Sequence, residues 1–72
     1  GIVKGESNMN QATEIFEYIK THPGADVQEI ADGTEWNRHV VEVATKIMVE
    51  RGMIRETGRT ECDDPKYELV AA

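Results

Sequence analysis

The segment from Arg38 to Arg51 has the strongest helical periodicity of the chain and restricts the possible folds more than any other feature. At about 100° per residue, its apolar side chains gather on one side and span roughly 160° of arc, wider than a usual apolar stripe. These side chains are Val40, Val41, Val43, Ala44, Ile47 and Met48. A helix with so wide an apolar surface must be covered from two directions, so we expect other elements on both sides of it.

The opposite side of this helix is short and polar. It carries Arg38, His39, Glu42, Thr45 and Lys46. Asn37 directly precedes the helix and is a good N-cap, because its side-chain oxygen can accept a hydrogen bond from a free N–H of the first turn. Gly52 directly follows and suits the position where a left-handed residue ends a helix. We therefore predict a helix over residues 38–51 whose polar face points away from the body of the domain.

Two shorter helices are predicted before it. Residues 10–21 carry apolar side chains at helical spacing, and the His-Pro-Gly sequence at 22–24 ends this helix, because the residue before a proline disfavours the α conformation. Asp26 and Glu29 form a candidate capping box for a second helix from Val27 to about Asp32. A turn at 33–35 follows, and Trp36 is expected in the core.

The last part of the chain indicates a β-hairpin. Residues 53–57 alternate weakly between apolar and polar, and residues 66–70 alternate cleanly, with Tyr67 and Leu69 on one face. The segment between them, 58–65, is a polar loop rich in turn-forming residues. A bare three-helix bundle with an irregular tail is the alternative, but it explains the alternation at 66–70 less well.

These elements predict one domain of the α+β class, mainly α, over residues 10–72, preceded by a disordered leader at 1–9. No apolar run approaches the roughly 18 residues of a membrane span, and no signal peptide is visible, so we expect no membrane contact and a cytoplasmic location. The single cysteine, Cys62, excludes an internal disulfide and fits a reducing compartment.

The order of elements resembles that of winged helix-turn-helix DNA-binding domains, and so do two segments of sequence. IFEYIKTHPGADVQEIA resembles the first helix, Pro-Gly link and second helix of this superfamily, and VVEVATKIMVERGMIRETG resembles its recognition helix and the entry to its wing. The resemblance covers about residues 12–70. It implies three helices followed by a two-stranded β-hairpin wing. It also implies a small sequence-specific DNA-binding module or transcriptional regulator, whose third helix enters the major groove of double-stranded DNA.

The resemblance also implies which residues meet DNA. In this superfamily the first turns of the third helix read base edges, and basic residues of the wing reach the backbone. The matching positions here are Asn37, Arg38, His39, Glu42, Lys46, Arg55 and Arg59. Arg38 can form a bidentate contact with guanine, and Glu42 can accept from a cytosine amino group. The same pattern also suits a solvated helix surface with (i, i+4) ion pairs at Arg38–Glu42 and Glu42–Lys46.

The charge balance leaves a second function open. The net charge of −6 lacks the basic footprint usual for nucleic-acid binding. Residues 1–36 carry two basic and seven acidic side chains, whereas residues 37–72 carry six and seven, so the basic residues concentrate in the half that would meet DNA. The alternative is an acidic winged-helix module for protein–protein interaction. Its partner would be a basic protein or another copy docking on Val40, Val43 or Val49.

The sequence contains no catalytic or metal-binding pattern. It has no glycine-rich phosphate loop after a strand, no nucleophile with a nearby base, and no closely spaced cysteine and histidine pairs of the kind that bind structural zinc. We therefore expect no enzymatic activity, no cofactor and no metal.

Overall fold

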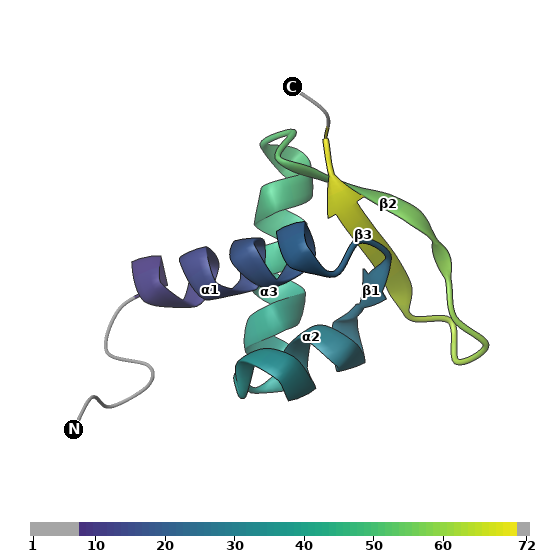
Figure 1. Ribbon diagram of the computed structural model, residues 1–72, viewed down its shortest axis with the longest axis horizontal. Helices are drawn as coiled ribbons and strands as arrows, with labels where there is room; N and C mark the ends of the chain where they lie inside the picture. Colours follow the sequence, from purple (N-terminus) through teal and green to yellow (C-terminus); the bar gives the residue numbers. More distant parts are fainter. Residues whose placement is uncertain (1–7, 71–72) are drawn as a thin grey trace.

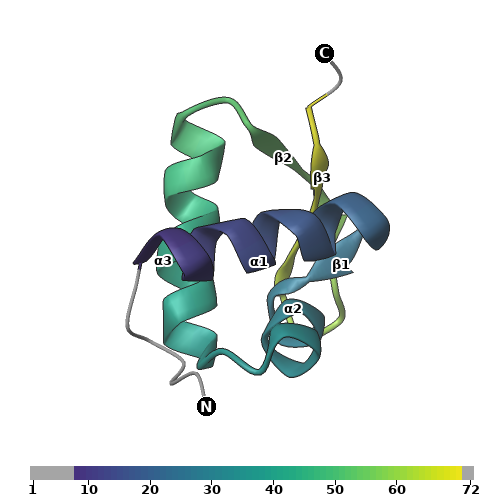
Figure 2. The same cartoon turned by 60° about the vertical axis from the view of Figure 1, so that its left-hand side comes forward.

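The computed structural model describes residues 8–70, which form three helices and a three-stranded antiparallel sheet (Figure 1). The elements are α1 (Asn8–Thr21), β1 (Ala25–Asp26), α2 (Val27–Thr34), α3 (Arg38–Glu50), β2 (Ile54–Arg59) and β3 (Pro65–Leu69). In both views α1 runs across α3 at a steep angle, and the β2–β3 hairpin extends along one side of the helices (Figures 1 and 2). The fold is therefore α+β and mainly α, as predicted.

One apolar core joins the elements, and every helix and strand contributes to it. Its buried members are Ile15, Ile19, Ala25, Val27, Ile30, Ala31, Trp36, Val41, Met48, Ile54 and Tyr67. The low exposure of Trp36, between α2 and α3, confirms its prediction as a core residue. The ring nitrogen of Trp36 donates to the Glu14 carboxylate at 3.1 Å, so the buried N–H has a partner on α1.

The first helix begins earlier than predicted. Helix α1 begins at Asn8, so the last two residues of the predicted leader 1–9 belong to the helix. The rest of that leader, 1–7, lies outside the described residues. The predicted end of α1 at Thr21 is confirmed, and Gly24 turns the chain at φ +85, a conformation that favours glycine.

The sheet has one strand more than the predicted hairpin. Strand β1 pairs antiparallel with β3, with Ala25 opposite Tyr67 and Asp26 opposite Lys66, which gives the strand order β1-β3-β2. Two residues are too few to show an alternating pattern, so this strand has no signal in the sequence. Its pairing places β3 in the middle of the sheet, and Tyr67 is buried there.

The hairpin itself has different bounds from those predicted. Strand β2 extends to Arg59, and β3 begins at Pro65, so the connecting loop is 60–64 rather than 58–65. The register shifts between Glu56 and Gly58, which marks a bulge in β2. The short loop is closed by backbone hydrogen bonds from Thr60 N–H to Asp64 and from Asp63 N–H to Thr60, both 2.9 Å long.

Helix α2 is longer than predicted. The capping box is confirmed: Asp26 Oδ1 accepts from the Glu29 N–H at 2.8 Å, and the Asp26 N–H donates to Glu29 Oε1 at 3.4 Å. The helix continues through Gly33 and Thr34, so their assignment to a turn is wrong, and it ends at Glu35 in the left-handed conformation, φ 65. The turn between α2 and α3 therefore lies at residues 35–37 rather than 33–35.

Helix α3 ends one residue earlier than predicted, with Arg51 as its cap and Gly52 following at φ +74. Elements α1, α2 and β2 pack on it from different sides, as expected, but they leave part of its apolar stripe uncovered, because Val43 is 46% and Ile47 43% exposed. The placement of Thr45 on the polar face is also wrong, since Thr45 is fully buried. Its hydroxyl donates to the Val41 carbonyl at 2.8 Å, so the buried oxygen is satisfied inside the helix.

Gly33 allows α1 and α2 to approach closely. A Cβ atom at Gly33 would lie 2.1 Å from Tyr18 Cε2, and the Tyr18 ring is held by stacking on His22 at 4.0 Å between ring centroids. We predict that Gly33→Ala lowers the free energy of unfolding by about 1–3 kcal/mol, as other overpacked sites do. Urea denaturation followed by circular dichroism measures this change.

Two further variants test whether the clash with Tyr18 causes this loss of stability. In a Tyr18→Leu background the clash is absent, and Gly33→Ala should then be neutral or stabilising by up to about 1 kcal/mol, because alanine is the better helix former. Gly58→Ala is the control, because no atom lies within 4 Å of its Cβ position. Equal losses from Gly33→Ala in both backgrounds would contradict the packing explanation.

Candidate nucleic-acid interface

The predicted site residues of the helix lie together on the exposed side of the first half of α3. Asn37 caps the helix, as predicted, and its Oδ1 accepts from the His39 N–H at 2.7 Å. Arg38 Nε donates to Glu42 Oε2 at 3.0 Å, and His39 Nδ1 lies 3.9 Å from Glu42 Oε1. Lys46 is exposed one turn further along. These five side chains therefore form a continuous polar strip, which we call the α3 strip.

Arg38 is engaged by the protein itself. Its Nη1 donates to Gln28 Oε1 at 3.2 Å and to Asp64 Oδ2 at 3.3 Å, and its Nη2 donates to Asp64 Oδ1. Together with the bond to Glu42, four of the five guanidinium N–H groups have acceptors. Arg38 thereby joins α2, α3 and the hairpin loop at one point.

This arrangement fixes the role that Arg38 can take. Hydrogen bonds to Asp64, and secondly to Glu42, raise the pKa of Arg38 further above its ordinary value, so the side chain stays charged. The bidentate face that would match guanine is occupied by the Asp64 carboxylate, which is only 16% exposed. In this conformation Arg38 holds the hairpin loop against the helices and presents no free fork to a base.

The two predicted arginines of the hairpin are also paired. Arg55 Nε donates to Glu68 Oε2 at 2.6 Å across the β2–β3 pairing, where these residues lie opposite each other. Arg59 lies 3.2 Å from Glu56 Oε1 and 3.5 Å from Asp63 Oδ1. Both arginines are solvent-exposed, so phosphate groups could compete with these carboxylates, but neither guanidinium contacts the α3 strip within residues 8–70.

The charge around the strip alternates rather than forming a positive face. Within residues 8–70, Lys46 and Arg51 make no ion pair, and they are the basic residues of α3 and its cap that remain for an outside ligand. Glu42 and Asp64 neutralise Arg38 from two sides. Electrostatic attraction to a phosphate backbone therefore rests on few groups.

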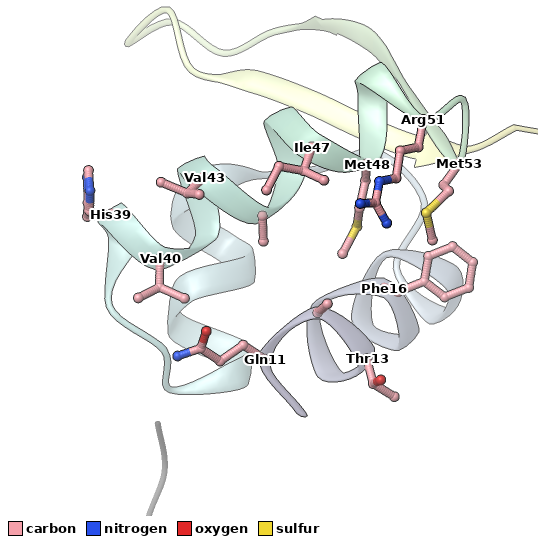
Figure 3. A pocket seen from close by; sticks show the side chains of 12 residues that line it. Gln11, Thr13, Phe16, His39, Val40, Val43, Ile47, Met48, Arg51 and Met53 are labelled. Atoms are coloured by element: carbon pink, nitrogen blue, oxygen red, sulfur yellow. The ribbon is translucent and has the colours of Figure 1, made fainter. Parts of the chain in front are cut away.

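The sequence reasoning missed two features of this region. Asp64 and Gln28 hold Arg38, but they lie 26 and 10 residues away from it, and no local pattern connects them. A groove of about 570 Å³ opens beside the strip, between α1 and α3 (Figure 3). Apolar side chains of Phe16, Val40, Val43, Ile47 and Met53 line it, with His39 toward one end and Arg51 toward the other. The wide apolar stripe was its sequence signal.

Two other kinds of feature are absent from the described part of the chain. Residues 8–70 hold no cluster of three or more metal-ligating side chains, and none of their helices is long and apolar enough to cross a membrane. Cys62 is exposed on the hairpin loop. In comparisons with known proteins, no family model matches the chain and no curated protein is significantly similar to it.

The Arg38–Asp64 contact should hold the hairpin loop in place. We predict that Asp64→Asn speeds hydrogen exchange at the loop amides 60–64, because the NH2 group that replaces one carboxylate oxygen cannot accept from the Arg38 guanidinium. The Arg38 side chain is then held less firmly, and its Nε–H signal should broaden. Asp63→Asn is the matched control, since Asp63 is 83% exposed and contacts Arg59 instead. Two-dimensional NMR measures the amide exchange rates of both variants and shows whether only Asp64→Asn loosens the loop. Equal loosening by the two changes would show that the Arg38 contact does not hold the loop.

Proposed function

We propose that the protein is a winged helix-turn-helix module that binds double-stranded DNA with α3 in the major groove. The observation that carries the proposal is the exposed α3 strip, at the start of a helix that follows α2 after a turn of only residues 35–37. Under this proposal the hairpin, which is tied to α3 through Arg38 and Asp64, would serve as the wing. A helix of this size fits the major groove, where the edges of all four base pairs can be distinguished.

The contacts within the strip assign different roles to its members. Lys46 has no partner within residues 8–70 and is the natural phosphate contact, because lysine binds phosphate as a point charge. His39 and the side-chain amide nitrogen of Asn37 can donate to base edges or phosphates. Glu42 can accept from a cytosine amino group. Arg38 acts as a positioning residue that sets the hairpin relative to α3.

The small number of unpaired basic residues predicts how DNA affinity should depend on salt concentration. Each phosphate neutralised by a lysine or arginine adds about 0.9 to the slope of log affinity against log salt. With few unpaired basic residues on α3, the slope should be shallow and non-specific affinity weak. Binding should therefore be measured at about 50 mM salt, where phosphate contacts are strongest. Absence of any binding to random-sequence duplex there would rule the proposal out.

Lys46 offers a direct test of the phosphate contacts. We predict that Lys46→Ala weakens binding to every duplex alike and lowers the salt slope by about 0.9, because one released counterion is lost. Fluorescence anisotropy at several salt concentrations measures both quantities. Lys20→Ala on α1 removes the same charge outside the strip and should leave the slope unchanged. If the two variants behave alike, the α3 strip is not the phosphate-binding surface.

A variant of Glu42 tests whether this side chain reads a base. We predict that Glu42→Gln reduces the preference among duplexes that differ in single base pairs, because glutamine no longer offers a carboxylate to cytosine. Competition binding against a set of single-base variants of a selected sequence measures this preference. A uniform gain in affinity with unchanged preference would mean that Glu42 only repels phosphate.

A second candidate function is supported by a separate observation. The groove between α1 and α3 leaves Val43 and Ile47 exposed, and such apolar surface is typical of protein-interaction sites. Under this alternative the domain binds a protein and α3 is not a DNA reader. NMR shift mapping separates the two functions. Shifts at His39 and Lys46 on adding duplex support DNA binding, whereas shifts confined to the groove on adding a protein support the alternative.

A further inference from the structure

We infer that the groove between α1 and α3 binds a second copy of the chain, through antiparallel pairing of the two α3 helices about a two-fold axis near Thr45. The groove contains most of the large exposed apolar side chains of residues 8–70, namely Val43, Ile47 and Met53, with half-buried Phe16 and Val40 beside them. Figure 3 shows these side chains around one open space between the two helices.

The apolar positions of α3 are self-complementary. In a two-fold antiparallel pair, residues at equal distances on either side of the axis meet each other. The midpoint between Val43 and Ile47 falls at Thr45, so Val43 of one copy would lie against Ile47 of the other, and the reverse. Val43 and Ile47 are four residues apart and therefore share one face of the helix.

The charges beside the groove follow the same symmetry. The midpoint between His39 and Glu50 falls between Ala44 and Thr45, next to the proposed axis. These residues are about three helical turns apart and share one side of α3, so Glu50 of one copy would reach His39 of the other. Within residues 8–70, Glu50 makes no ion pair, and His39 is 82% exposed with only a 3.9 Å contact to Glu42. Both groups are thus available to a partner.

The lining also argues against a basic partner at this position. Among the described residues 8–70, no carboxylate lines the groove, and the ionisable residues that do, His39 and Arg51, are basic, although the whole chain carries a net charge of −6. A basic protein would find its complement elsewhere on the surface. A second copy supplies apolar side chains for the floor of the groove and the Glu50 carboxylate for the His39 edge.

Such a pair would be incompatible with binding two adjacent half-sites on DNA. Packed helices lie about 8–10 Å apart, whereas recognition helices on successive major grooves are about 34 Å apart. Self-association through the groove would therefore compete with DNA binding of that kind. The inference itself does not depend on DNA binding, and its test contains no DNA.

Sedimentation velocity of the wild-type chain from about 10 µM to about 1 mM should show a monomer–dimer equilibrium, in the range where weak complexes form. Ile47→Glu should leave only monomer, because it puts two carboxylates into the apolar centre of the pair. Val49→Glu is the matched control, since Val49 is exposed on α3 but does not line the groove. Circular dichroism confirms that both variants remain folded.

Charge reversal gives a second, independent test of the pairing geometry. His39→Glu and Glu50→Lys should each weaken the dimer by about 2- to 5-fold, the range expected for exposed ion pairs. The double variant places Glu at position 39 and Lys at position 50, so opposite charges face each other across the pair, and it should bind at least as tightly as the wild type. A wild-type chain that stays monomeric at about 1 mM, equal losses in Ile47→Glu and Val49→Glu, or no restoration in the double variant would each overturn the inference.

Discussion

The pairing of β3 with both β1 and β2 holds the two halves of the chain together. The Gly24 N–H donates to the Tyr67 carbonyl at 2.8 Å, and the adjoining β1 residues pair with the same stretch of β3. This contact ties the α1–α2 connection to the C-terminal strand and closes the core over Tyr67 and Ile54. A chain of this size buries only about 60% of the surface that its unfolded state exposes. A long-range connection of this kind therefore matters more here than in a larger domain.

The parts of the fold that could be predicted are those with local signals. The Asp26–Glu29 capping box, the Asn37 cap and the glycine after α3 each indicate an element within a few residues, and the structure contains all three. Strand β1, the extension of α2 through Gly33 and the burial of Thr45 have no such signal. The strand depends on its distant partner β3, and Thr45 is buried by the surrounding core. The Tyr18 ring lies so close to Gly33 that it leaves no room for a side chain there, which the sequence could not show.

The features of the candidate site can likewise be separated into those with a local sequence signal and those without one. Exposure of the α3 strip could be predicted, because the helical period separates polar from apolar positions, and the Arg38–Glu42 pair follows from (i, i+4) spacing. The sequence could not show that Asp64 occupies the guanidinium, because the hairpin loop reaches α3 only through the tertiary fold. That one contact changes Arg38 from a candidate for base reading into a residue that positions the hairpin, and within residues 8–70 it leaves Lys46 as the cation of the strip without an ion pair.

Two surfaces of α3 therefore remain open to partners, and each suits a partner of different polarity. The strip is polar and nearly neutral, whereas within residues 8–70 the groove is apolar and lacks carboxylates. Fully burying a side chain such as Val43 or Ile47 contributes about 1.5–3 kcal/mol, which is a large share of the total stability of a small domain. Val43 and Ile47 both line the groove and lie on the same face of α3. This arrangement is better explained by a second molecule that completes the core of the groove than by incidental exposure.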